Sequence, residues 1–247
     1  MRAARLMHPV LMVTAHGSAD PRSAATTYAV AEQIRLLRTD LDVRVAFCEK
    51  NTPNLRDALA ALDGPAIVTP LLLASAYHAR VDIPALIAGA VAERSIQVSQ
   101  AETLGEDPRL VKLLHQRIEE CTADEDPAGL GVLVVAVGSS DHAANARTAR
   151  VAEALTHLGT WAGVQMAFAT GPSPTVGDGI EQLRRLGARR VVFAPWFIAQ
   201  GRITDRLAAT AGQAGAVAMA EPLGAHPLIA ATVLDRFERA RRRRSAA

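Results

Sequence analysis

Short apolar runs alternate with amphipathic stretches along the chain. Runs such as 10–15, 43–47 and 66–70 are rich in Val, Ile and Ala, which is typical of buried parallel strands. Between them, residues 24–38 and 108–120 carry apolar side chains at helical spacing. Strands that alternate with helices predict an α/β fold, in which helices cover both faces of a parallel sheet.

The chain also repeats itself with a period of about 120 residues. Residues 10–15 followed by His-Gly-Ser-Ala-Asp correspond to residues 132–136 followed by Val-Gly-Ser-Ser-Asp. Three further pairs of segments match in the same order along the two halves. Each half therefore predicts four strand–helix units, which together form a Rossmann-like or flavodoxin-like module.

The repeat predicts a division into two modules. We expect an N-terminal module over residues 1–123 and a degenerate C-terminal module over residues 129–247. The acidic segment 122–129, which contains Pro127, is typical of a linker between such modules.

Charge and composition restrict the classes of partner. With 27 basic and 25 acidic residues, the net charge of +2 predicts neither nucleic-acid nor membrane binding. The arginines at 241–244 suit a solvated helix end, although a tail for nucleic acid or an anionic surface is an alternative. No apolar run is long enough to span a bilayer, so we expect a cytoplasmic protein. Cys48 and Cys121 form no CxxC pair and are expected to be buried thiols.

Candidate chemistry follows the strands of the first half. In open parallel sheets, ligands bind beyond the carboxyl ends of the strands. His16 follows the first strand, Glu49 the second, and His78 lies after the third. Two imidazoles and a carboxylate suit a divalent metal such as Fe, Co, Ni or Zn, with coordination positions left open. Spacing alone also allows a structural His16, and a Glu49 that is solvated or paired with Arg80 or Lys50.

The segment after the third strand also carries a helix signal. Asp82 followed by Pro84 predicts that a helix begins here, with Asp82 as its N-cap.

Three segments together resemble the CbiX/SirB family of sirohydrochlorin chelatases. They are Ala-His-Gly-Ser-Ala-Asp-Pro-Arg at 15–22, the stretch from Pro-Leu-Leu-Leu to Tyr-His-Ala-Arg-Val-Asp-Ile-Pro at 70–84, and Leu-Gly-Glu-Asp-Pro-Arg-Leu at 104–110. The resemblance is good over residues 9–120 and weaker in the second half. It implies the double-length form, with two similar α/β modules in one chain.

The family resemblance implies an enzyme, a lyase that inserts a divalent metal into a tetrapyrrole without ATP. The metal is a substrate, Fe²⁺ for siroheme or Co²⁺ for a cobalamin precursor, and Ni²⁺ suits the same ligands; no organic cofactor is expected. The motif histidines match His16 and His78, and the acidic site residue matches Glu49. We expect the histidines to coordinate or deliver the metal, and Glu49 to complete the site or accept protons.

The second half departs from this pattern. Val137 stands in the place of His16, Thr170 stands in the place of Glu49, and residues 196–205, which follow Pro195, contain no histidine. One site per chain is therefore expected, and a monomer whose two modules form the cleft.

Residues near the predicted site would bind the carboxylates and the ring of the substrate. Arginine suits bidentate carboxylate binding, although Arg22 and Arg80 fit local salt bridges equally well. The candidate substrate-binding residues are Ser18, Arg22, Tyr77, Arg80 and Arg202. Leu72, Leu73, Trp196 and Phe197 are candidates either for the macrocycle cavity or for the core.

Two other functions compete with the chelatase interpretation. A metal or tetrapyrrole carrier would keep both histidines without turnover. A phosphate- or nucleotide-binding α/β protein would use Gly17-Ser18 as a cradle, but the sequence has neither a G-x-G-x-x-G nor a Walker A pattern.

Overall fold

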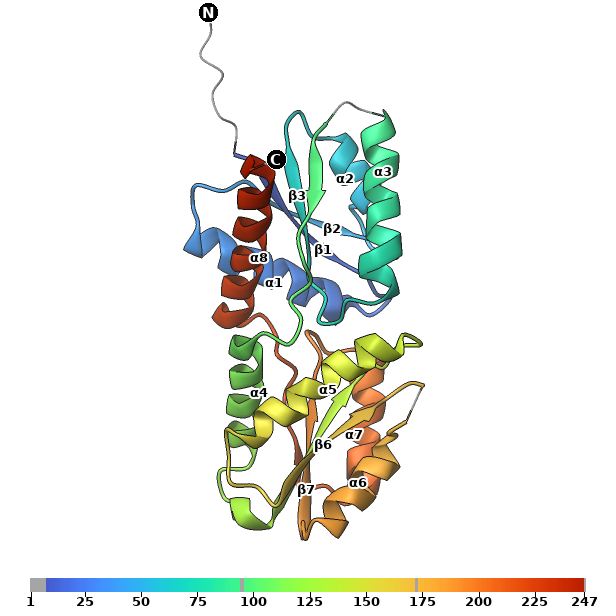
Figure 1. The fold of residues 1–247 in the computed structure, drawn as a ribbon, viewed down its shortest axis with the longest axis vertical. Helices are drawn as coiled ribbons and strands as arrows, with labels where there is room; N and C mark the ends of the chain where they lie inside the picture. Colours follow the sequence, from blue (N-terminus) through green and yellow to red (C-terminus); the bar gives the residue numbers. More distant parts are fainter. Residues whose placement is uncertain (1–7, 94–95, 172, 247) are drawn as a thin grey trace, which may run out of the picture. The chain divides into compact units, whose positions relative to one another are not determined.

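The computed structural model describes residues 8–93, 96–171 and 173–246. It contains two four-stranded parallel sheets, with strand orders β2-β1-β3-β4 and β6-β5-β7-β8 (Figure 1). Helices cover both faces of each sheet, so the predicted α/β class and the two-module architecture are confirmed.

Strands and helices alternate as the sequence pattern predicts. The strands are β1 Val10–Ala15, β2 Val43–Phe47, β3 Ala66–Pro70, β4 Val98–Gln100, β5 Leu130–Ala136, β6 Gly163–Phe168, β7 Arg190–Pro195 and β8 Ala218–Met219. The α-helices are α1 Pro21–Leu37, α2 Leu55–Ala60, α3 Ile83–Glu93, α4 Pro108–Cys121, α5 His142–Thr156, α6 Val176–Arg185, α7 Arg202–Gln213 and α8 Pro227–Ala246. Two short turns complete the set, the π-helical η1 His78–Asp82 and the 3₁₀-helical η2 Pro127–Gly129.

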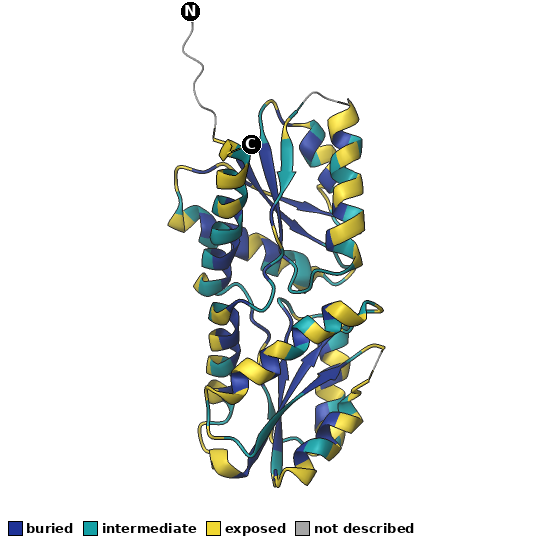
Figure 2. Ribbon diagram, viewed as in Figure 1, coloured by how far each residue is buried: buried dark blue, intermediate teal, exposed yellow. Residues whose placement is uncertain are grey.

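The sheets form the core of each module because their strands are apolar on both faces. Every residue of β1 and of β5 is buried, as the dark strands of Figure 2 show. Helices α1 and α4 begin with an Asp-Pro pair, in which the carboxylate of Asp20 or Asp107 accepts a hydrogen bond from a first-turn N–H. These caps fix the residue at which each helix begins.

The two sheets have the same register, which confirms the repeat at the level of single residues. Ala15 pairs with Phe47 in the first sheet, as Ala136 pairs with Phe168 in the second. At the next strand, the N–H of Leu71 donates to the carbonyl of Thr14 over 2.8 Å, which matches the bond from Trp196 to Val135.

The two compact units of the structure do not coincide with the two halves of the sequence. The last helix of each half, α4 or α8, belongs to the unit that contains the other half's sheet. One unit contains residues 1–105 and 225–247, and the other contains residues 106–224. Helix α8 packs against α1 and β3 in the first unit, while α4 packs against α5 and β7 in the second. The units thus differ from the expected division into 1–123 and 129–247. Segment 122–129 lies inside the second unit and is no linker between units.

Helix α8 is attached to the first unit by both apolar and polar contacts. Its buried face includes Val233 and Phe237. The guanidinium of Arg236 donates to the carbonyls of Thr103 (3.0 Å) and Leu104 (2.8 Å). From the arginine run, Arg243 pairs with Glu102 at 2.8 Å, so part of this charge is neutralised within the unit. No helix in the described part of the chain combines the length and the apolar character needed to cross a bilayer.

Candidate metal-binding site

A tight turn after β1 carries His16. Gly17 has a φ of +98°, and a Cβ atom at this position would lie 1.8 Å from the carbonyl oxygen of Glu49. Only glycine fits this backbone. The loops after β1 and β2 approach each other closely here, and the N–H of Glu49 donates to the carbonyl of His16 over 2.9 Å. The loops after β1 and β2 are therefore locked together, and they bring His16 and Glu49 to the same edge of the sheet.

The same turn is held by Asn51, a residue that the family motifs do not include. Its Oδ1 accepts a hydrogen bond from the N–H of Ser18 over 2.7 Å. The hydroxyl of Ser18 in turn accepts from the N–H of Asp20 over 3.0 Å, just before α1. In this structure the predicted substrate-binding residue Ser18 thus supports the loop.

The two predicted histidines lie in close contact, with their rings tilted relative to each other. The ring centroids of His16 and His78 are 3.9 Å apart, with an interplanar angle of 56°. Nδ1 of His16 lies 3.5 Å from Oε1 of Glu49; this nitrogen is buried, and no described residue forms a hydrogen bond with it. The three residues that sequence reasoning selected are therefore brought together in one unit.

Neighbouring charges and burial tune the groups around the pair. Glu49 is half exposed and lies 2.9 Å from Nζ of Lys50. The hydrogen bond from Lys50 lowers the pKa of Glu49, and the positive charges of His16 and His78, when these are protonated, add to the effect. Burial raises the pKa of the neighbouring Cys48 thiol to about 11, with help from the carboxylates of Asp82 and Glu49. Cys48 therefore stays a neutral thiol near neutral pH.

His78 lies on a π-turn that the sequence pattern did not reveal. Residues His78–Asp82 form η1, which runs directly into α3. The expectation that Asp82 caps a helix beginning at this point is wrong, because helical backbone already begins at His78. The carboxylate of Asp82 instead forms a hydrogen bond with Nδ1 of His78. Asp82 is thus a site residue that sequence reasoning missed, since an Asp two residues before a proline is also a common helix start.

The predicted substrate-binding residues differ in their surroundings. Tyr77 is 63% exposed, and its ring meets that of His78 edge-on at 6.0 Å. Arg22 forms a bidentate pair with Asp20 at 3.0 and 2.6 Å, which is the local salt bridge considered as the alternative. Arg80 donates to Oγ of Ser75 at 3.4 Å. Arg202 is exposed at the first position of α7, in the second unit.

The second unit keeps the loop geometry of this site without its chemistry. The N–H of Thr170 donates to the carbonyl of Val137 over 2.9 Å, as Glu49 does to His16, and Gly138 repeats the positive φ of Gly17. Val137 and Thr170 therefore occupy the places of His16 and Glu49, as the sequence predicts. Trp196 and Phe197 are buried, and Phe197 belongs to the core of this unit, so the core interpretation holds for Phe197.

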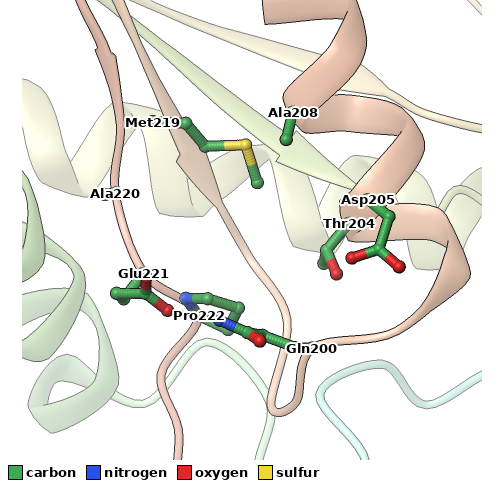
Figure 3. A pocket seen from close by; sticks show the side chains of 8 residues that line it. All are labelled: Gln200, Thr204, Asp205, Ala208, Met219, Ala220, Glu221 and Pro222. Carbon is green, nitrogen blue, oxygen red and sulfur yellow. Dashed lines mark hydrogen bonds between the residues drawn. The ribbon is translucent and has the colours of Figure 1, made fainter. Parts of the chain in front are cut away.

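A pocket of about 170 Å³ lies at the corresponding edge of the second sheet. Figure 3 shows its lining, which contains two carboxylates and no imidazole. The lining residues are Gln200, Thr204, Asp205, Ala208, Met219, Ala220, Glu221 and Pro222. Nε2 of Gln200 donates to Glu221 over 2.7 Å, so part of its polarity is satisfied internally.

Comparison with known proteins identifies the family. The CbiX family model matches twice, over residues 10–121 and 131–240. This chain belongs to the CbiX family. Both halves of the chain are thus CbiX repeats, including the second half, which lacks counterparts of His16 and His78.

The relatives of this chain include proteins named for two metals. A sirohydrochlorin ferrochelatase of Priestia megaterium is 30% identical over 210 residues, which cover 81% of this chain and 77% of the relative. A sirohydrochlorin cobaltochelatase of the same organism is 27% identical over 212 residues, covering 81% and 67%. The structure of SirB from Bacillus subtilis with Fe³⁺ matches with a TM-score of 0.82 at 20% identity, over 95% of this chain and 96% of that one. This structural likeness supports the fold.

The candidate site contains two imidazoles and two carboxylates, but these are not a closed ligand set. Within the described ranges, no three His, Cys, Asp or Glu side chains are already arranged to hold a metal ion. The tilted rings of His16 and His78 lie close together, and a carboxylate lies near Nδ1 of each ring. Unprotonated imidazole nitrogens and ionised carboxylates both bind divalent transition metals, so these residues have the chemistry of a metal site.

Proposed function

We propose that this chain is a sirohydrochlorin chelatase, a lyase that inserts Fe²⁺ or Co²⁺ into a tetrapyrrole without ATP. The observation that carries the proposal is the close pair of His16 and His78 at the rim of the first sheet, with Glu49 beside His16. The family match over both halves and the two Priestia megaterium relatives support the same substrate class.

The proposed roles follow from the proton balance of the reaction. Metallation exchanges two pyrrole N–H protons for one divalent cation. Neutral His16 and His78 would carry the cation to the ring face, because only unprotonated imidazole nitrogen binds a metal. Glu49, whose pKa is lowered by Lys50, would be available as a carboxylate ligand or as the first proton acceptor.

The proposed ligands do not select one metal. Imidazole and carboxylate bind Fe²⁺, Co²⁺ and Ni²⁺, with affinities that follow the general order of divalent ions. The two Priestia megaterium relatives carry the names of an iron and a cobalt enzyme. We therefore include both metals in the proposal.

The substrate would be held through its carboxylates and its ring. Ser18, Arg22 and Arg80 are the proposed polar contacts, and Arg202 stays a prediction from the sequence. Tyr77 is the proposed apolar contact, because its exposed ring adjoins His78. Arg22 would have to release Asp20, at least in part, to take this role. We also propose that the protein acts as a cytoplasmic monomer. Light scattering after gel filtration tests the oligomeric state.

The decisive experiment is a chelation assay that follows the absorbance change of sirohydrochlorin with Fe²⁺, Co²⁺ and Ni²⁺. We expect multiple turnovers by the wild type, and for His16→Ala and His78→Ala a loss larger than the roughly 10–100-fold typical of residues around metal ligands. His115→Ala is a matched control, because His115 lies on α4 in the second unit beside Glu119. Wild-type rates in both site variants would contradict the assignment, and tight binding without turnover would indicate a carrier.

A further inference from the structure

The π-turn places a carboxylate behind one of the two imidazoles. We propose that Asp82 is a positioning residue, which holds His78 in the tautomer with its proton on Nδ1 and so presents Nε2 to the metal. This inference rests on the proposed function, because it assumes that His78 receives the metal.

The pairing is built into the backbone of η1. The N–H of Ile83 donates to the carbonyl of His78, which closes the wide turn and places His78 and Asp82 on one side of it. The turn is anchored from β4, where Nε2 of Gln100 donates to the carbonyl of Ala79 over 2.7 Å. Ala79 is buried, so the turn is held from its inner side. π-Turns of this kind are often found at functional sites.

The chemistry of the pair determines which ring nitrogen is open. A neutral imidazole carries one N–H, and an ionised carboxylate can only accept a hydrogen bond. The bond between Asp82 and Nδ1 of His78 therefore requires the proton on Nδ1, which leaves the lone pair on Nε2. The negative charge also makes Nε2 a stronger donor to a cation, as is usual for metal-binding histidines with a carboxylate behind them.

Asp82 and Glu49 differ in how far they are committed to their histidines. Asp82 is hydrogen-bonded to its ring, whereas Glu49 lies 3.5 Å from His16 and also 2.9 Å from Nζ of Lys50. Asp82 is thus the carboxylate placed for orientation, while Glu49 is the one left to meet the metal or a proton.

The second unit lacks this arrangement as a whole. There α7 begins directly at Arg202, with no π-turn before it, and Met219 takes the register position of Gln100. Met219 lines the pocket of Figure 3 instead of anchoring a turn. Among the described residues, the π-turn and its glutamine anchor therefore occur together in the half that carries His16 and His78.

The proposal is tested by nuclear magnetic resonance on protein labelled with ¹⁵N-histidine, at a pH above the titration range of imidazole. Long-range ¹H–¹⁵N spectra distinguish the two tautomers of each ring. We expect the Nδ1–H form of His78 in the wild type, and a shift toward Nε2–H in Asp82→Ala. An Nε2–H form in the folded wild type would overturn the proposal, even if the alanine variant did not fold.

Metal affinity provides the second readout, with Co²⁺ alone as the probe. We expect Asp82→Ala to weaken Co²⁺ binding by about 10–100-fold. The isosteric Asp82→Asn should lose less, because its amide oxygen can still accept from Nδ1. Asp42→Ala, which removes an exposed carboxylate paired with Arg44 in the same unit, should bind like the wild type. Unchanged affinity in Asp82→Ala, with loss in His78→Ala, would overturn the positioning role alone. Wild-type affinity in His78→Ala would instead overturn the proposed metal site.

Discussion

Oε1 of Glu49 lies 3.5 Å from Nδ1 of His16, at the junction of the loops that follow β1 and β2. The nitrogen is buried, while the carboxylate is half exposed. Glu49 can therefore turn toward an incoming ion without breaking a hydrogen bond to His16, which makes its charge the feature to test.

Replacing Glu49 with glutamine keeps its size and removes that charge. We expect Glu49→Gln to slow metal insertion by about 10-fold or more, because a neutral amide is a poorer metal ligand and no proton acceptor. Initial rates with sirohydrochlorin and Co²⁺ measure this. Glu32→Gln, which changes an exposed glutamate paired with Arg35, serves as the control and should leave the rate unchanged.

Gly17 is expected to tolerate no side chain. In Gly17→Ala the new Cβ would overlap the carbonyl oxygen of Glu49, so we expect a loss of about 2 kcal/mol or more in the free energy of unfolding, together with weaker Co²⁺ binding. Gly138→Ala is the matched control, because its Cβ would lie 2.6 Å from the carbonyl oxygen of Thr170. The control should lose stability and keep its Co²⁺ affinity. Equal affinity in the two variants would contradict the link between this turn and the site.

Asn51 offers a milder test of the same loop. Asn51→Ala leaves the N–H of Ser18 without its acceptor and should cost about 1 kcal/mol of unfolding free energy. The chelation rate should fall as well, because Ser18 directly follows the His-Gly turn. Asn145 accepts from Ser139 over 2.9 Å in the second unit, so Asn145→Ala should show a similar stability loss at a normal rate. Denaturant unfolding and initial rates separate the two effects.

Metal stoichiometry should be one per chain. Val137 and Thr170 fill the places of His16 and Glu49 in the second unit, so we expect calorimetry to give one Co²⁺ site in the wild type and none in the double variant His16→Ala/His78→Ala. Val137→His should not add a second site, since no counterpart of His78 is available there. A stoichiometry of two in the wild type would be incompatible with this interpretation.

The pairing between α1 and α8 predicts an acid-dependent stability. Hydrogen bonds from Arg38 lower the pKa of Asp40 to about 2. Burial opposes ionisation of Glu238, but hydrogen bonds from Arg241 and Arg38 outweigh it and lower that pKa too. Lowered carboxyl pKa values contribute stability above the unfolded-state values, near 4, and lose it as the pH falls toward 2. We therefore expect the free energy of unfolding at pH 5 to be larger for the wild type than for Arg38→Gln. This difference should become smaller below pH 4.

Most of the fold could be predicted because local patterns of apolar and polar residues determine its strands and helices. The apolar runs fix the strands, and the carboxyl ends of parallel strands share one edge, so His16 and Glu49 could be placed together before any coordinates. The repeat placed Val137 and Thr170 in the equivalent positions of the second half, and the register of the second sheet agrees with this prediction.

Three features could not be predicted, for physical reasons. The π-turn at His78 differs from an α-helical turn by one residue, a difference that apolar periodicity does not resolve. Cys48 and Cys121 are half buried and not fully buried, because apolar neighbours in sequence do not determine how tightly a residue packs after a strand or at a helix end. The exchange of α4 and α8 was also invisible, because an amphipathic helix specifies an apolar face and not the sheet that covers it.

The exchange of terminal helices has a consequence for how the protein is made. The half that carries His16 and His78 leaves the ribosome before the second unit, yet its unit is completed by α8, which follows the second unit in the sequence. During translation the face of the first sheet that α8 covers must wait uncovered for more than a hundred residues, a distance over which aggregation competes with folding. The unit that contains His16 and His78 therefore cannot be completed until residues 225–246 have been synthesised.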